Sequence, residues 1–146
     1  MKTIFRQLYD NLSSTYTYLL ADADSREAAI IDPVFELHRR DLALIHELEL
    51  NLKYTLDTHC HADHITGSWL MKKATGCKIV LSKKYKASQV DIPVDEGDSV
   101  VFGGIRLRVW ATPGHTDGCL TYVTDDQKMA FTGDCLMIRG AGRTDF

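Results

Sequence analysis

Residues 53–67 read KYTLDTHCHADHITG and place a dense polar cluster between two elements of regular structure. The first part, Lys53–Thr58, predicts a short strand, and Ile65–Ala74 predicts a helix that ends at Gly76. Three of the six histidines of the chain lie in the connection, together with one aspartate. A strand, a polar loop and a helix in this order are typical of an α/β fold, in which sites gather at strand ends.

The connecting segment carries the pattern HxHxDH: His59, His61, Asp63 and His64. Imidazole and carboxylate groups at such short spacing are the donors that hold zinc or iron in proteins. His59 and His61 are two residues apart and would point the same way in an extended segment, whereas Asp63 and His64 could face a second ion. A polar loop in which Asp63 caps the helix is the alternative, but three histidines exceed what capping requires.

Two further motifs follow predicted strands later in the chain. TPGHTDG, residues 112–118, combines proline and glycine in a tight loop that presents His115. FTGDCL, residues 131–136, places Asp134 directly after a glycine. Each motif alone also fits an ordinary turn. Together with His59 they supply two imidazoles and one carboxylate, which is the ligand set of non-haem iron(II) oxygenases.

The remaining pattern predicts helices that alternate with strands in the first part of the chain and antiparallel pairs in the last part. A mixed sheet in an α/β layered fold follows from this order. One hairpin is predicted around Gly103-Gly104, with Ile105, Leu107 and Val109 facing inward, and another across residues 125–127. The other predicted elements are strands at Ile4–Leu8, Ser14–Leu20, Ala28–Asp32 and Lys78–Ser82, and a helix at Glu36–Leu48.

Composition excludes several classes of protein. The 146 residues correspond to about one domain, and 45% hydrophobic with 25% charged residues is ordinary globular composition. A net charge of −3 without a large basic cluster argues against a nucleic-acid partner, and the lack of a long apolar run argues against a membrane span. The four cysteines form no CxxC pair, which argues against a cysteine-rich zinc knuckle. Because no secretory signal is evident, we expect reduced thiols in a cytosol-like compartment rather than disulfides.

With the motifs THCHADH, TPGHTDG and FTGD in this order, the chain resembles the metallo-β-lactamase fold superfamily. The runs STYTYLLAD and DCLMIRGAGRTDF narrow the resemblance to its persulfide dioxygenase branch. The resemblance implies an αββα sandwich of two similar halves. We therefore expect residues 1–146 to be an incomplete metallo-β-lactamase-like domain, the N-terminal half plus the start of the second, with the C-terminal part absent from this chain.

This resemblance also implies a cofactor and a reaction. In the persulfide dioxygenase branch, one Fe(II) is bound by the residues that correspond here to His59, His115 and Asp134. His61, Asp63 and His64 are then supporting groups that orient ligands and water. The reaction implied is the oxidation of glutathione persulfide by O2 and water to sulfite and glutathione. Arg139 and Arg143 are weaker candidates that either bind the anionic substrate or fix the loop beside Asp134.

Two alternatives remain open at the level of sequence. A glyoxalase II-type thioester hydrolase with two zinc ions would use all of HxHxDH as ligands and needs a further histidine beyond residue 146. An inactive fragment is the other. The N-terminus MKTIFRQLYD has neither an apolar signal core nor a transit peptide, so a bacterial-type cytoplasm is expected rather than a mitochondrial matrix. The pattern leaves oligomeric state open, with a homodimer as one option.

Overall fold

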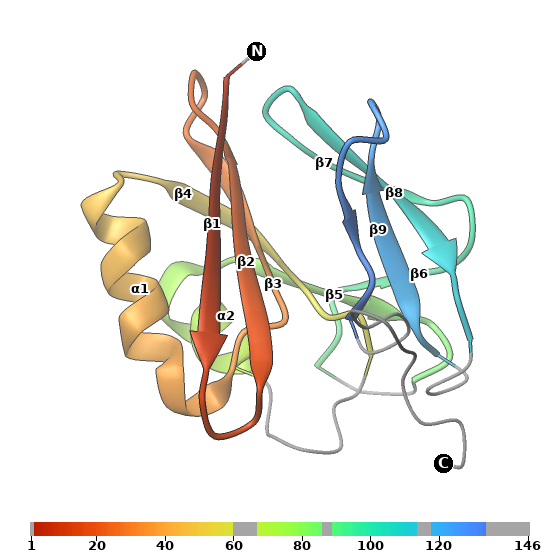
Figure 1. The fold of residues 1–146 in the computed structure, drawn as a ribbon, viewed down its shortest axis with the longest axis horizontal. Helices are drawn as coiled ribbons and strands as arrows, with labels where there is room; N and C mark the ends of the chain where they lie inside the picture. Colours follow the sequence, from red (N-terminus) through yellow and green to blue (C-terminus); the bar gives the residue numbers. More distant parts are fainter. Residues whose placement is uncertain (1, 60–66, 86–88, 114–117, 134–146) are drawn as a thin grey trace.

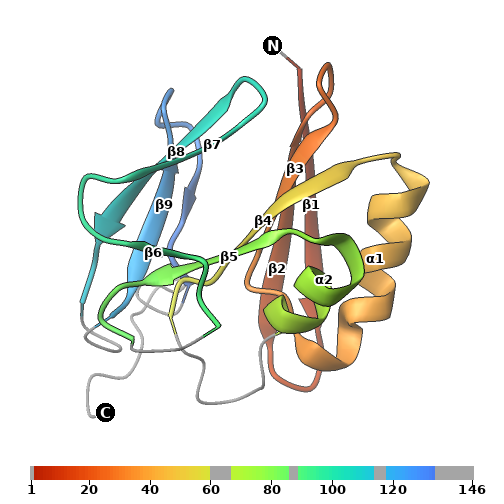
Figure 2. The same cartoon turned by 180° about the vertical axis from the view of Figure 1, so that it is seen from behind.

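The computed structural model describes residues 2–59, 67–85, 89–113 and 118–133. These residues form two β-sheets that face each other, with helices α1 (His38–Glu47) and α2 (Ser68–Thr75) on the outer side of the first sheet. Figures 1 and 2 show this order of layers from opposite sides. Three layers of the expected αββα sandwich are therefore present, and the described residues add no helix outside the second sheet.

The first sheet has six strands in sequence order: β1 (Thr3–Asp10), β2 (Thr15–Asp22), β3 (Glu27–Ile31), β4 (Asn51–Leu56), β5 (Lys78–Ser82) and β6 (Ile92–Val94). Strands β1, β2 and β3 are antiparallel because short turns connect them. Strands β3 to β6 run parallel, with α1 in the crossover from β3 to β4 and α2 in the crossover from β4 to β5. The predicted mixed sheet is confirmed, although β6 was not predicted.

The second sheet is antiparallel and has the order β10-β9-β8-β7, formed by β7 (Ser99–Phe102), β8 (Ile105–Ala111), β9 (Leu120–Thr124) and β10 (Ala130–Phe131). Both predicted hairpins are present, with Phe102 paired to Ile105 in one and Ala130 paired to Val123 in the other. The inward residues of β8 are buried and the alternate ones are exposed, so the period-two pattern placed this strand correctly.

Two hydrophobic clusters hold the layers together. One lies between the sheets and includes Leu20, Leu56 and Tyr122, while the other lies under the helices and includes Leu19 and Met71. Strand β2 contributes to both, because Leu19 and Leu20 are successive residues of a strand and point to opposite faces. Leu19, Leu20 and Ala21 are all buried, so both faces of this part of β2 are covered, which explains its three consecutive apolar residues.

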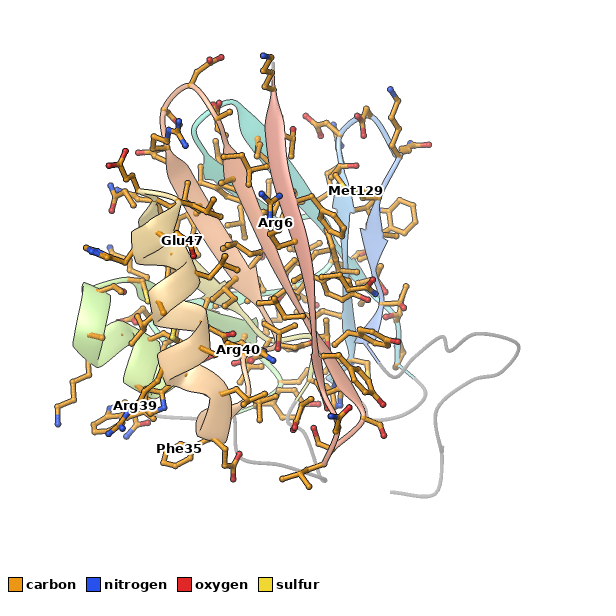
Figure 3. The ribbon with its side chains drawn as sticks, turned by 60° about the vertical axis from the view of Figure 1, so that its left-hand side comes forward. Arg6, Phe35, Arg39, Arg40, Glu47 and Met129 are labelled. Atoms are coloured by element: carbon orange, nitrogen blue, oxygen red, sulfur yellow. The ribbon has the colours of Figure 1, made fainter. Side chains whose placement is uncertain are left out.

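The helix predicted at Glu36–Leu48 begins with one 3-10 turn, Phe35–Leu37, and continues as α1. Figure 3 shows Arg40 on the side of this helix that faces β1, where its Nη1 donates a hydrogen bond of 2.8 Å to the Tyr9 carbonyl. On α2, Met71 is buried. Trp69 is 44% exposed, and Lys73 Nζ lies 5.2 Å from the centroid of its ring. None of the described helices is long and apolar enough to cross a membrane.

Candidate metal centre

Of the predicted site residues, His59 is the one that lies in the described part of the chain. The other predicted site residues lie outside the described ranges: His61, Asp63, His64, His115, Asp134, Arg139 and Arg143. The residues that flank each motif are described, however. Their contacts show how the ends of the three motif-bearing segments are arranged.

His59 follows β4 and is 1% exposed. Its Nδ1 lies 3.0 Å from the hydroxyl Oγ1 of Thr58, the residue before it. Thr58 is buried as well, and Asp32 accepts hydrogen bonds from it at both carboxylate oxygens, 2.8 Å from the Thr58 amide and 2.8 Å from the hydroxyl. The imidazole is therefore held at a strand end by a buried chain of polar groups.

The segment Asp32–Val34 anchors both ends of the histidine-rich connection. Asp32 holds the entry at Thr58, and the Pro33 carbonyl accepts a hydrogen bond of 2.7 Å from the Gly67 amide at the exit. A side chain at Gly67 would have its Cβ 2.9 Å from the Val34 carbonyl oxygen, so only glycine fits there without movement of the backbone. The two ends of the connection are thus fixed to one short segment that follows β3.

The second motif is closed at its base. The Thr112 amide donates to the Cys119 carbonyl at 3.0 Å, so the two flanks of TPGHTDG meet. The next amide, Leu120, donates to the Thr58 carbonyl at 2.7 Å and joins the start of β9 to the end of β4. Gly118 lies against the ring of Tyr85, where an added Cβ would come within 2.5 Å of Cε2. The loop that carries His115 in the sequence therefore begins and ends beside Thr58.

The third motif, FTGDCL, also has a flank beside Thr58. Gly133, which directly precedes Asp134 in the sequence, has φ +58° and packs against the Thr58 side chain. A Cβ built on Gly133 would meet the Thr58 hydroxyl and would be 3.4 Å from Nδ1 of His59. Flanks of all three motifs therefore converge on Thr58 and His59, directly after the end of β4.

A second buried polar group supports this end of the sandwich. The Tyr122 hydroxyl donates to the Asp57 carbonyl at 2.9 Å, and the Ser68 hydroxyl donates to Asp57 Oδ2 at 2.8 Å. Burial, with the charges of Asp57 and Asp32 acting in the same direction, raises the pKa of Tyr122 well above its usual range. Tyr122 is therefore a neutral donor that ties β9 to the end of β4 beneath the site.

The donor set at this edge fits a metal ion of the zinc or iron type. With Nδ1 of His59 occupied by Thr58, its Nε2 is the ring nitrogen that a metal would use, and buried imidazole with a hydrogen-bonded second nitrogen is the usual arrangement of metal-bound histidine. Within residues 2–59, 67–85, 89–113 and 118–133 alone, no three metal-ligating side chains are grouped, since the other predicted ligands lie outside these ranges.

Three residues of this arrangement were not identified from the sequence: Asp32, Thr58 and Tyr122. Asp32 stands before Pro33 at the end of a predicted strand, and this position indicated only where the strand stops. Thr58 directly precedes the first histidine, and this position is only a weak indication that it belongs to the site. Tyr122 is one of six tyrosines, and no pattern distinguished it before β9 was placed against β4.

The chain matches a known protein family and is similar to individual proteins of named activity. Residues 10–146 match the family described as the metallo-beta-lactamase superfamily. The mouse (Mus musculus) protein named persulfide dioxygenase ETHE1, mitochondrial, is 54% identical over 144 residues, which cover 98% of this chain and 56% of the mouse protein. The crystal structure of ETHE1 from Myxococcus xanthus is similar with a TM-score of 0.93 at 49% identity, covering 98% of this chain and 62% of that chain.

A relative with another activity in its name is more distant. The hydroxyacylglutathione hydrolase of Rhodopseudomonas palustris is 38% identical over 144 residues, which cover 94% of this chain and 54% of the hydrolase. The chain therefore spans a little more than half the length of these two curated relatives. The proteins named persulfide dioxygenase share more of the sequence than the hydrolase does.

Proposed function

Since this chain belongs to the metallo-beta-lactamase superfamily, we propose that it provides the metal centre of an iron(II)-dependent persulfide dioxygenase. The observation that carries the proposal is the convergence of three motif flanks on Thr58 and His59. The identity of 54% to a protein named persulfide dioxygenase, against 38% to a thioester hydrolase, supports this reaction over hydrolysis.

In this proposal His59, His115 and Asp134 bind one Fe(II), and His61, Asp63 and His64 orient these ligands and water by hydrogen bonds. Iron(II) in such a two-histidine, one-carboxylate set supplies a redox-active ion with open positions for substrate and dioxygen. His59 is suited to its part because burial excludes competing water and Thr58 fixes the ring. Arg139 and Arg143 would attract the anionic substrate.

The substrates proposed are glutathione persulfide, O2 and water, and the products are sulfite and glutathione. The bond between the two sulfurs breaks, and the outer sulfur leaves with three oxygens, two supplied by dioxygen and one by water. Dioxygen is the oxidant and the outer sulfur is oxidised, so no further redox partner is required. Bound iron would supply a common site for the two reactants, and bringing them together there would account for a large part of the rate gain.

The proposal extends to the cellular compartment and the oligomeric state of the protein. Cys77 and Cys119, the cysteines of the described part of the chain, are buried and form no disulfide, which supports a reducing compartment of the bacterial cytoplasmic type. The mouse relative is named mitochondrial, and that compartment is the competing prediction. A homodimer is retained as a prediction that light scattering of the purified protein would test.

The leading test measures metal and reaction together. The protein is purified without oxygen, its iron and zinc are quantified, and oxygen uptake is followed with glutathione persulfide. About one iron per chain and persulfide-dependent oxygen uptake are expected. Two zinc ions with cleavage of a glutathione thioester would instead establish the hydrolase that the Rhodopseudomonas relative suggests. Absence of both metal and activity would favour the inactive fragment.

Two variants sharpen the ligand assignment. His115→Ala is expected to abolish iron binding, because it removes one of three ligands. His64→Ala should retain bound iron with weaker affinity, because a supporting group typically changes metal affinity by about 10–100-fold. Equal loss of iron in both variants, measured by metal analysis after dialysis, would contradict a centre built on His59, His115 and Asp134.

A further inference from the structure

We propose that Thr58 is the positioning residue of the metal centre, and that its hydroxyl fixes the tautomer of His59 so that Nε2 is the nitrogen that binds the ion. This inference rests on the proposed role of His59 as a metal ligand. It concerns two groups that the motif pattern did not assign, the Thr58 hydroxyl and the Asp32 carboxylate, and the direction in which protons are held along them.

The direction of the hydrogen bonds follows from the donors and acceptors present. Asp32 Oδ1 accepts the Thr58 amide, and Asp32 Oδ2 lies 2.8 Å from the Thr58 hydroxyl. An ionised carboxylate can only accept, so the hydroxyl proton is directed to Asp32. The Thr58 oxygen then offers a lone pair to His59 Nδ1 at 3.0 Å, and Nδ1 must carry the ring proton. A neutral ring protonated at Nδ1 leaves Nε2 as the metal-binding nitrogen.

Asp32 is held in place by its own hydrogen bonds, so its carboxylate can fix the direction of the hydrogen bonds along Thr58 and His59. Its amide donates to the Leu56 carbonyl at 2.9 Å, and its carbonyl accepts the Thr17 hydroxyl at 2.8 Å. Its φ is +55°, a left-handed conformation that is uncommon for a residue other than glycine and persists where surrounding contacts enforce it. With only 3% of Asp32 exposed, water has little access to compete for its carboxylate.

The same threonine also sets the positions of the other two motif flanks. Its carbonyl accepts the Leu120 amide at 2.7 Å, next to the segment that carries His115. Its side chain is the surface against which Gly133 packs, one residue before Asp134. One residue thus contacts the flanks of all three predicted ligands, and the chain Asp32–Thr58–His59 links the end of β3 to the metal-binding nitrogen.

Substitutions at Thr58 separate the hydroxyl from the shape of the side chain. Thr58→Val keeps the branched shape and removes the hydroxyl, whereas Thr58→Ser keeps the hydroxyl. Thr55→Val is the matched control, because Thr55 is a fully buried residue of β4, three residues before Thr58, and its hydroxyl has no hydrogen-bond partner among the described residues. Circular dichroism establishes that each variant is folded before binding is measured.

Two measurements are made on each protein. The tautomer of His59 is read from nitrogen-15 NMR of the metal-free protein, and Fe(II) and Zn(II) affinities come from chelator competition. Wild type, Thr58→Ser and Thr55→Val are expected to show the Nδ1-protonated ring and similar affinities. Thr58→Val should lose that tautomer preference and bind metal about 10–100-fold more weakly.

Asp32→Asn gives a second, sharper prediction. The Thr58 amide still needs an oxygen acceptor, so the new amide nitrogen would face the Thr58 hydroxyl and donate to it. The hydroxyl would then donate to His59, and the ring would carry its proton on Nε2 with weaker metal binding. This reversal is also the fallback if Thr58→Val does not fold.

The proposal is overturned if Asp32→Asn retains the Nδ1-protonated ring, or if Thr58→Val keeps both tautomer and affinity. Equal weakening in Thr58→Ser and Thr58→Val, or in Thr55→Val, would assign the effect to packing and also overturn it. Because the tautomer is measured without metal, its result is independent of whether the purified protein contains iron and consumes oxygen. Failure of the proposed reaction and failure of this inference are therefore distinguishable.

Discussion

The two ends of the sandwich use the same device, a carboxylate that accepts main-chain N–H groups, with different consequences. At the end away from the site, Asp22 Oδ2 accepts the Gly104 amide at 2.7 Å and Glu27 Oε1 accepts the Gly103 amide at 2.6 Å. These bonds join the turn after β2 to the β7–β8 hairpin, at the upper edge of Figure 1. At the site end, Asp32 holds Thr58, and through it the ring of His59.

The difference shows when a carboxylate that accepts main-chain N–H groups also becomes part of a functional site. Asp22 and Glu27 accept glycine amides directly, so these two hydrogen bonds fix one sheet against the other without reaching the site. Asp32 acts through a hydroxyl on an imidazole, so its effect extends to which ring nitrogen is available. We therefore expect substitutions at the site end to change stability and metal affinity together, and substitutions at the far end to change stability alone.

The largest effect is expected for Gly133→Ala. An added methyl group would clash with Thr58 and would occupy a left-handed conformation, which together destabilise the fold by roughly 2–4 kcal/mol. Urea denaturation measures this loss, and chelator competition should show weaker metal binding. Gly76→Ala is the control, since Gly76 has φ +75° but nothing within 4 Å of an added Cβ, and it should cost about 1 kcal/mol with metal binding unchanged.

Tyr122→Phe should have the next largest effect. The variant removes the hydroxyl that donates to the Asp57 carbonyl and leaves that buried carbonyl without its 2.9 Å partner. We expect a loss of about 1–2 kcal/mol in the free energy of unfolding. Because Tyr122 lies beneath the site, metal affinity should also fall. An unchanged urea midpoint would show that the hydroxyl contributes nothing to the junction of β9 with β4.

Asp22 predicts a dependence on pH at the far end. The hydrogen bond from the Gly104 amide is the main cause that lowers the pKa of Asp22 below its usual value of 3.8. A lowered pKa means that this stabilisation is complete above pH 3.8 and is lost as the pH falls through the lower value of the folded protein. Asp22→Asn should therefore reduce the urea midpoint at neutral pH, by less than Tyr122→Phe does.

The difference between Asp22→Asn and wild type should shrink toward zero as the midpoints are compared at pH values progressively further below 3.8. Metal affinity at neutral pH should be the same in both proteins. A change of metal affinity in Asp22→Asn would contradict the distinction between a carboxylate that joins the sheets, Asp22, and a carboxylate that orients a metal ligand, Asp32.

The smallest effect is expected for Arg108→Ala at the surface. Arg108 Nε donates to Asp125 Oδ1 at 2.8 Å, but the two side chains are 55% and 47% exposed, so water and salt screen the pair. The free energy of unfolding should change by no more than about 0.5 kcal/mol, and less in high salt. A loss comparable to that of Tyr122→Phe would mean that the exposed ion pair matters as much as a buried hydrogen bond.

Most elements of the fold followed from local pattern. Alternation in β8 placed Ile105 inward and Arg106 outward, and Gly76 ends α2 in the left-handed conformation that only glycine adopts readily. The missed strand β6 has three residues with Pro93 at its centre, which removes a ladder donor and suppresses the strand signal. On α2, Met71 is buried whereas the larger apolar Trp69 is 44% exposed, so residue type alone does not reveal which face of a helix is buried.

The sequence by itself determined the candidate ligands and the order of elements, because residue types and their spacing are local properties of the chain. It did not determine the contacts that set His59, since Asp32 is 26 residues from Thr58, and Tyr122 is 65 residues from Asp57. Only the tertiary structure brings these groups within hydrogen-bonding distance, when parallel pairing of β3 with β4 and packing of the two sheets bury them together. Burial then forces each polar group to find a partner, and that requirement decides which nitrogen of His59 is left for the metal.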